Sequence, residues 1–215
     1  MSIIIDILDV RMKEIIKIPY SEFDYQALMY ALKDYRYPRD RVTKLVASGE
    51  IIRVKKGLYI KADDYRNGPL YKEILANMIY GPSYISLEYA LSFYQIIPEK
   101  VETILSVTTE KNKIYNTQAG IFRYRHIPLS FYFRGVRSVQ IPDSRSYLIA
   151  SPEKALADFI YFEKGINSKK DLEILLFDNM RMDEYAVREL DKTLLAYITG
   201  SLKRNSFRYL IEIMD

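Results

Sequence analysis

The alternation of apolar and polar positions divides residues 1 to about 62 into three helical stretches followed by a hairpin. From Ile3 to Lys17 the apolar side chains recur close to the 3.6-residue period of an amphipathic helix. A second such stretch follows Ser21, which we expect to be its N-cap because an acidic residue stands three positions later. A third runs from Pro38 to Ser48, since proline suits the first helical position and Gly49 suits the end of a helix.

A hairpin is predicted after the third helix. Two short runs of β-branched and apolar residues, Ile51–Val54 and Leu58–Ile60, flank the loop Lys55-Lys56-Gly57. A three-residue loop with glycine last fits a type I turn and a glycine bulge, because that last position needs a positive φ. The polar segment from Ala62 to Pro69 is typical of a linker, so we place a domain boundary after residue 64.

The rest of the chain combines helices with strands. An amphipathic helix is expected from Leu70 to Ile79, and Ser86 is expected to cap another. Ser151-Pro152-Glu153 predicts a further helix start, and residues 168–214 have a helical pattern. From about Val101 to Leu148 the pattern alternates as it does in strands, in the segments TILSVTT, GIFRYRHI, LSFYFRGV and SYLIA.

These elements predict an α+β protein, and 215 residues are enough for two domains. Residues 1–64 have the element order of a winged helix-turn-helix, in which the third helix enters the major groove of DNA and the hairpin meets the flanking backbone. Residues 65–215 are expected to form a mixed α/β domain with a mainly antiparallel sheet and C-terminal helices.

The positive charge of the chain is concentrated in the first domain. The formal net charge is +4, but the stretch from Lys33 to Lys61 holds nine basic and three acidic residues. That stretch therefore carries +6, and the rest of the chain carries −2. A local excess of this kind favours binding to a polyanion more than the global charge does.

The third helix has an apolar and a polar face. Val42, Leu45 and Val46 share the face that must pack on the first two helices, and Thr43 and Lys44 lie opposite among short or basic side chains. Such a polar face can approach base edges in the major groove, which is about 12 Å wide. The alternative is that these charges form a solvated surface without a ligand.

The candidate DNA-binding residues lie before and along this helix and in the hairpin. Thr43 and Lys44 are expected to face the bases, and the other side chains are expected to contact mainly phosphate. Tyr59 is expected to pack within the hairpin. The candidates are Arg36, Arg39, Arg41, Thr43, Lys44, Arg53, Lys55 and Lys56.

The stretch VTKLVASGEIIRVKKGLYI resembles the N-terminal signature of the AbiEi family of antitoxins and transcriptional regulators. Many members have glycine before the recognition helix, where this chain has Tyr35-Arg36-Tyr37, and the last 50 or so residues match nothing in that family. The matching positions are Leu45, Gly49, Ile51, Arg53, Gly57 and Tyr59. The resemblance spans roughly Ser21 to Glu163 and also includes Tyr84–Pro98, Thr108-Thr109 and Tyr147–Ile160.

This resemblance implies a sequence-specific DNA-binding transcriptional regulator that acts as antitoxin and autorepressor of a toxin–antitoxin operon. The implied partners are double-stranded operator DNA and a nucleotidyltransferase-like toxin from the same operon. Two alternatives remain open, a module that neutralises a partner toxin directly and a winged-helix regulator without a toxin partner. An enzyme in the C-terminal domain is a third possibility.

The sequence is poor in residues for metal binding and catalysis. It has no cysteine and one histidine, His126, which we expect to be structural or on the surface. Glycine-rich nucleotide motifs, a Gly-x-Ser-x-Gly elbow and an Asp-x-Asp pair do not occur. Lys154 and Asp158, four residues apart, are expected to pair on a helix in a structural role. We therefore expect no enzyme, no metal and no cofactor.

The N-terminus does not resemble a signal peptide, because Asp6 and Asp9 interrupt its apolar run and no basic segment precedes that run. No stretch approaches about 18 uncharged apolar residues, so no membrane span is expected. The expected location is the cytoplasm. The pattern leaves the oligomeric state open.

Overall fold

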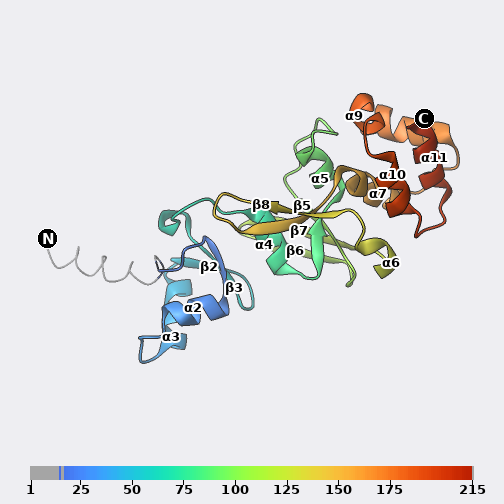
Figure 1. Ribbon diagram of the computed structural model, residues 1–215. Coiled ribbons are helices and arrows are strands. Elements are labelled where there is room, and N and C mark those ends of the chain that lie inside the picture. The colour runs from blue at the N-terminus through green and yellow to red at the C-terminus, as the bar shows by residue number, and fades with distance from the viewer. Residues whose placement is uncertain (1–14, 16, 215) are drawn as a thin grey trace. The chain divides into compact units, whose positions relative to one another are not determined.

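The computed structural model describes residue 15 and residues 17–214, which fall into two compact units, residues 1–79 and residues 80–215 (Figure 1). Nearly all of the helix expected from Ile3 to Lys17 lies outside the described residues. Each unit has its own sheet. The two units are therefore described one at a time.

The first unit contains a small antiparallel sheet in which β3 lies between β1 and β2. The two helices and the hairpin predicted for this region are present, whereas the sequence pattern does not predict β1. In chain order the elements are β1 (Glu22–Asp24), α2 (Tyr25–Ala31), α3 (Pro38–Ala47), β2 (Ile51–Lys55), β3 (Leu58–Lys61), the 3₁₀ turn η1 (Asp63–Tyr65) and α4 (Lys72–Ile79).

The start of α2 differs from the prediction. Asp24, not Ser21, is the N-cap, and its carboxylate accepts a hydrogen bond from the Ala27 N–H at 2.8 Å. The residues before Asp24 are extended because they pair with β3, and Phe23 is buried with its ring stacked on Tyr59 at 6.2 Å. Ser21 instead donates to the Gly68 carbonyl. A local cap signal was therefore outweighed by strand pairing with residues far along the chain.

The hairpin is tighter than expected. Lys55 belongs to β2 and pairs with Leu58, so the connection is only Lys56-Gly57, and the register shifts between Arg53 and Lys55. Gly57 has φ +82°, as the loop pattern predicts. Its carbonyl accepts from the Tyr25 N–H at 2.9 Å, which joins the hairpin tip to the first turn of α2.

The core of the first unit is formed by apolar side chains from α2, α3 and the sheet. On α3, Val42 and Leu45 are buried as predicted, but Val46 is 36% exposed and lies at the edge of the packing face. Tyr59 packs in this core, which also confirms its predicted role. The polar face of α3 therefore points away from the core.

The second unit is built on a mixed sheet in the order β6-β7-β5-β4-β9-β8. The β4–β5, β6–β7 and β8–β9 pairs are antiparallel, and the β4–β9 and β5–β7 pairs are parallel. The strands are β4 (Ser83–Ile85), β5 (Ile104–Thr108), β6 (Lys113–Thr117), β7 (Gly120–His126), β8 (Val136–Gln140) and β9 (Ser146–Ala150). A mixed α+β fold with C-terminal helices is therefore confirmed.

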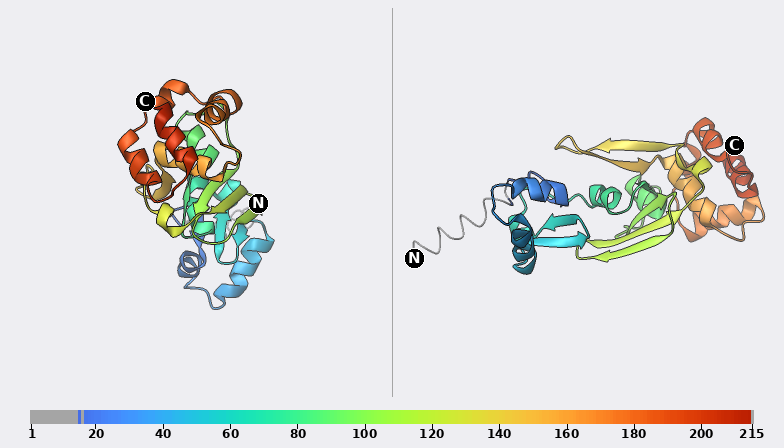
Figure 2. Two further views of the ribbon diagram at one scale, coloured as in Figure 1. Left: turned by 90° about the vertical axis from the view of Figure 1, so that its right-hand side faces the viewer. Right: turned by 90° about the horizontal axis from the view of Figure 1, so that it is seen from below.

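Helices pack on this sheet and gather beyond one of its ends (Figure 2). Within the described residues they are α5 (Leu87–Phe93), α6 (Leu129–Tyr132), α7 (Pro152–Phe162), α8 (Lys169–Glu173), the π-helical segment η2 (Ile174–Asn179), α9 (Glu184–Arg188), α10 (Lys192–Thr199) and α11 (Asn205–Ile213).

The segment Leu129–Val136 is not the strand that its sequence suggested. It forms the short helix α6, and β8 begins only at Val136. Phe131 and Tyr132 are buried, whereas Leu129 is 60% exposed, so the pattern of burial is helical and not alternating. Pro128 stands at the N-cap with an extended backbone, which suits a helix start directly after it.

Candidate nucleic-acid interface

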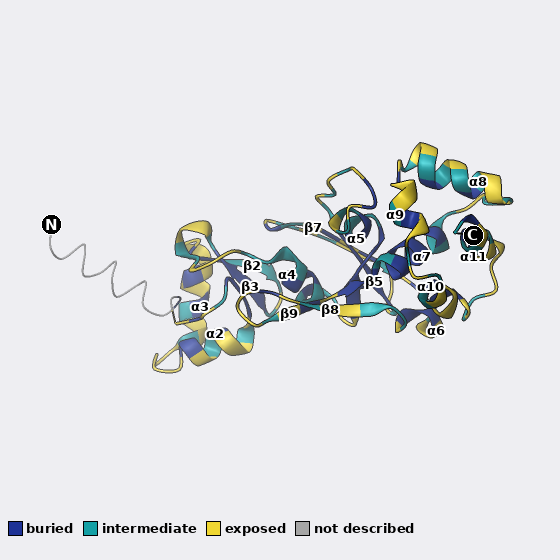
Figure 3. Cartoon of the chain, turned by 45° about the horizontal axis from the view of Figure 1, so that its top comes forward, coloured by how far each residue is buried: buried dark blue, intermediate teal, exposed yellow. Residues whose placement is uncertain are grey.

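Helix α3 presents a polar surface with positive charge. Thr43 and Lys44 are exposed and Arg41 is half-buried, opposite the buried Val42 and Leu45. Figure 3 shows buried and exposed stretches alternating along α3. Proline stands at the first helical position, as predicted. Because the apolar face is held by the core, the helix cannot rotate these polar side chains inward without exposing Leu45.

The hydroxyl of Thr43 already has a partner. Its Oγ1 donates to the Arg39 carbonyl at 3.2 Å, one turn earlier in α3. Thr43 is exposed, so a rotation about χ1 would release this hydroxyl for another acceptor. Arg39 is itself exposed in the first turn, where its guanidinium can reach an anion beside the helix.

The loop between α2 and α3 adds aromatic rings that sequence reasoning missed. Arg36 lies over the Tyr37 ring at 5.2 Å, and Arg41 lies over the Tyr35 ring at 6.0 Å. Tyr37 is 60% exposed. Cation–π contacts of this kind restrict long side chains and hold their charge near the surface. The Tyr-Arg-Tyr alternation in the sequence is the signal that could have revealed them.

The three basic residues of the hairpin are not equivalent. Arg53 and Lys56 are exposed, whereas Lys55 is half-buried. The Lys55 Nζ donates to the Ile79 carbonyl at 2.5 Å, at the C-terminal end of α4. Burial lowers the pKa of the Lys55 ammonium. Lys55 therefore joins the hairpin to α4, while Arg53 and Lys56 extend their charge into solvent.

The structure thus places all eight candidate residues in the first unit, on two segments that share one core. Five lie on α3 or in the loop before it, and three lie on the hairpin. Leu45 of α3 and Ile51 of β2 are both members of that core. Seven of the candidates are exposed or half-buried at the surface. The eighth, Lys55, is half-buried and donates its ammonium group to a carbonyl of α4.

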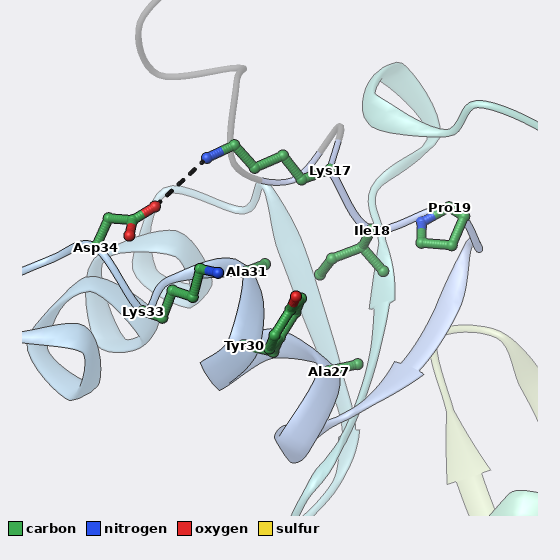
Figure 4. Close-up of a pocket in the computed structure, with 8 residues that line it drawn as sticks. All are labelled: Lys17, Ile18, Pro19, Ala27, Tyr30, Ala31, Lys33 and Asp34. Atoms are coloured by element: carbon green, nitrogen blue, oxygen red, sulfur yellow. Dashed lines mark ion pairs between the residues drawn. The ribbon is translucent and has the colours of Figure 1, made fainter.

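A depression of about 450 Å³ lies beside α2 (Figure 4). Its wall is largely apolar, with Ile18 and Ala31 at its base, the ring of Tyr30 on one side and an ion pair between Lys17 and Asp34 at 4.0 Å. Among the described residues that line it, none is a candidate DNA-binding residue.

A second charged cluster lies inside the second unit. Lys154 and Asp158, one turn apart on α7, form an ion pair with an N–O distance of 2.7 Å, and neither side chain is exposed to solvent. The hydroxyls of Tyr84 and Ser86 donate to Asp158 Oδ2 at 2.9 Å and 2.7 Å. The Lys154 Nζ also donates to the Phe131 carbonyl at 2.6 Å. This cluster ties α7 to β4, to the start of α5 and to α6.

Desolvation dominates the electrostatics of this pair. Burial lowers the pKa of Lys154 and raises the pKa of Asp158, and the attraction between them opposes both shifts. Ser86 stands at the N-cap of α5, as predicted, but its hydroxyl serves Asp158 and makes no capping bond. Ser151 does cap α7, accepting from the Lys154 N–H at 3.2 Å. The predicted pairing of Lys154 with Asp158 is therefore confirmed.

His126 has structural partners in the turn before β6. Its Nδ1 lies 3.1 Å from the Thr109 carbonyl and 3.0 Å from the Glu110 carbonyl, so Nδ1 carries the proton. Within residue 15 and residues 17–214, no three His, Cys, Asp or Glu side chains gather as metal ligands would. In the same part of the chain, every helix is too short or too polar to cross a membrane.

Neither a scan against models of protein families nor a search of curated proteins finds a match. The resemblance to the AbiEi family therefore rests on the residue patterns between about Ser21 and Glu163, and its functional meaning belongs to the proposal that follows.

Proposed function

We propose that this chain is a sequence-specific DNA-binding transcriptional regulator of the AbiEi antitoxin type, which represses its own toxin–antitoxin operon. The observation that carries the proposal is that α3 and the β2–β3 hairpin, which share one core, both expose basic side chains. The first unit acts as a winged helix-turn-helix in this proposal, with α3 as the recognition helix and the β2–β3 hairpin as the wing.

The arrangement of the elements supports this assignment. Strand β1 directly precedes α2 and pairs with β3, so one short sheet connects the hairpin to the start of the helix pair. The bond from the Tyr25 N–H to the Gly57 carbonyl fixes the hairpin tip beside α2. A wing that is held at both its base and its tip can contact the DNA backbone while α3 stays in place.

The residues divide into three roles. Thr43 and Lys44 face the base edges, and Arg36, Arg39 and Arg41 contact phosphates near the start of α3. Arg53 and Lys56 contact the backbone beside the groove. Lys55 holds the hairpin on α4, because its ammonium is occupied by the Ile79 carbonyl.

Binding of the full-length chain to the DNA upstream of its own gene tests the proposal. With about five to seven phosphates neutralised, log K should fall against log salt with a slope of about −4 to −6. An excess of unrelated duplex DNA should compete poorly at moderate salt. A binding constant that hardly changes with salt, or equal competition by unrelated DNA, would contradict the proposal.

The antitoxin role has a test of its own. Arg53→Glu with Lys56→Glu should abolish repression while leaving the second unit intact, because both side chains are exposed in the first unit. The variant is co-expressed with the nucleotidyltransferase-like protein of the same operon, whose gene is placed under an unrelated promoter. Repression of the operon then cannot lower the toxin level, so neutralisation is measured by itself. Protection of the cells places antitoxin activity outside the DNA-binding face, and no protection means that repression is the whole effect.

A further inference from the structure

Three large apolar side chains stand exposed around α6 and α10. Leu129 is 60% exposed and Phe133 is 70% exposed, and because they are four residues apart they lie on the same side of α6. Tyr197 of α10 is 59% exposed. Arg134 connects the two elements, since its guanidinium lies 4.4 Å from the Tyr197 ring and donates to the Tyr197 carbonyl at 2.6 Å. Exposed apolar side chains that gather on neighbouring elements are characteristic of an interaction surface.

The charge around this cluster is positive. Arg204, in the connection between α10 and α11, lies over the ring of Tyr161 and donates to the Tyr161 carbonyl, and Tyr161 packs against the buried Phe131 of α6. Lys203 next to it is exposed. Residues 192–210 contain four basic residues, Lys192, Lys203, Arg204 and Arg208, and no acidic residue. We call Leu129, Phe133, Arg134, Tyr197, Lys203 and Arg204 the basic face.

The helices on the other side of the same unit have the opposite charge. Residues 169–191, which include α8, η2 and α9, contain four basic residues and seven acidic ones, Asp171, Glu173, Asp178, Asp183, Glu184, Glu189 and Asp191. Tyr185 is 75% exposed there, and Ile174 is 40% exposed. We call Ile174, Asp178, Glu184, Tyr185 and Glu189 the acidic face. Figure 3 shows α8 and α9 on one side of the helical layer and α6 and α10 on the other.

We propose that the basic face of one copy docks on the acidic face of a second copy of this chain. Each face has exposed apolar side chains that a contact would bury, and the opposite charges around them favour this pairing over basic-on-basic or acidic-on-acidic contact. Because the two faces lie on opposite sides of the unit, the contact is head-to-tail, and each copy keeps one unused face. This self-association does not depend on whether the first unit binds DNA.

Sedimentation velocity of the full-length chain over a wide range of concentration tests the proposal. The wild-type chain should associate as its concentration rises, and higher salt should weaken the association. Lys203→Glu with Arg204→Glu damages the basic face, and Asp178→Lys with Glu189→Lys damages the acidic face. Each double variant alone should associate at least roughly tenfold more weakly, because like charges then meet in the contact.

Mixing the two variants gives the decisive result. In an equimolar mixture faces of opposite charge meet again, so the mixture should regain the association that each variant alone has lost. Wild-type protein that stays monomeric at every concentration would overturn the proposal. So would a mixture that contains only monomers, or a single variant that still associates like the wild type.

A substitution without a charge change provides a second measure. Phe133→Ala should weaken self-association at least roughly tenfold if its exposed ring sits at the centre of the contact. Phe93→Ala on α5 is the matched control, because Phe93 is an exposed phenylalanine, at 46%, outside both faces. Equal effects of the two substitutions would contradict the assignment of the faces. Thermal unfolding of each variant checks that the fold is retained.

Discussion

The charged clusters of the two units differ in what surrounds them. In the second unit, Lys154 and Asp158 are fully buried, and hydroxyl and carbonyl groups from three other elements complete their hydrogen bonds. In the first unit, Arg53 and Lys56 of the hairpin and Lys44 of α3 are exposed. Charge that is buried and paired holds elements together, whereas exposed charge remains available to a ligand. The sequence shows charged residues in both places, and burial separates them.

The energies expected for the two environments differ accordingly. Removing charges from water costs several kcal/mol per ion, and the Lys154–Asp158 attraction offsets this only because neighbouring groups satisfy the remaining donors and acceptors. An exposed basic residue costs little to maintain, and salt screens it over about 10 Å at 0.1 M. The consequences of deleting one charge should therefore be large for stability in the second unit and small for stability in the first.

The largest expected effect follows from removing one member of the buried pair. Asp158→Ala leaves the Lys154 ammonium buried without its counter-charge, so the free energy of unfolding should fall by about 3–5 kcal/mol. Urea denaturation followed by circular dichroism measures this change. Lys154→Met with Asp158→Leu should recover part of the loss, because no unpaired charge then remains in the core.

A control with the same spacing is available on α9. Glu184 and Arg188 are also one turn apart with an N–O distance of 2.7 Å, but their side chains are 57% and 42% exposed. Glu184→Ala should therefore change the free energy of unfolding by less than about 0.5 kcal/mol. If the Asp158 and Glu184 substitutions cost the same, burial would not be the feature that separates the two kinds of cluster.

The second effect concerns the exposed charges of the hairpin. Arg53→Glu with Lys56→Glu should reduce operator affinity at least roughly tenfold and make the salt slope about 2 units shallower, because two phosphate contacts are lost. Fluorescence anisotropy over a salt series measures both quantities. Lys111→Glu with Lys113→Glu makes the same change of charge at exposed positions of the second unit. A similar loss in that control would place the DNA contact elsewhere.

Much of the fold could be predicted where the signal is local. The sequence Ser-Pro-Glu starts α7 as expected, with Ser151 as its cap, because all three preferences act within one turn. Gly49 and Gly57 have the positive φ that a helix end and a tight turn require. By contrast, β1 and β4 are three residues long, which is too short for an alternating pattern to be recognised.

The candidate site was predictable to the same extent and for the same reason. Exposure of Thr43 and Lys44 follows from the helical period, which also buries Leu45. The partner of Lys55 could not be predicted, because Ile79 is 24 residues further along the chain and the contact depends on how α4 packs. Likewise, Ser86 and Asp158 are 72 residues apart, so nothing local indicates that Ser86 serves the buried pair.

The third effect tests specificity and not charge. Thr43→Ala removes the hydroxyl that a rotation about χ1 would release from the Arg39 carbonyl, and it leaves every basic residue in place. The preference for operator over unrelated DNA should fall roughly fivefold to tenfold, about 1 kcal/mol, while the salt slope stays unchanged. Competition titrations at one salt concentration measure the preference. A drop in affinity that is equal for both DNAs would mean that Thr43 does not face the bases.

The smallest effect is expected at Lys55, which combines features of both environments. Lys55→Met keeps the aliphatic chain but removes the bond to the Ile79 carbonyl, so we expect a loss of no more than about 1 kcal/mol in the free energy of unfolding. Operator affinity should change less than twofold, since this ammonium already has a partner within the fold. A loss of affinity like that of the Arg53 and Lys56 double variant would return Lys55 to the DNA-contacting set.

The pH dependence of Lys55→Met sharpens this last comparison. Burial lowers the pKa of Lys55 in the folded chain below its ordinary value of 10.5. Between those two pKa values the unfolded chain binds more protons at this residue than the folded chain, so the free energy of unfolding of the wild type rises with pH. Methionine does not titrate, so the difference in free energy of unfolding between the wild type and Lys55→Met should grow as pH approaches 10.5. A difference that does not change with pH would mean that Lys55 does not sit in a buried environment, and the distinction between held and available charge would fail within the hairpin itself.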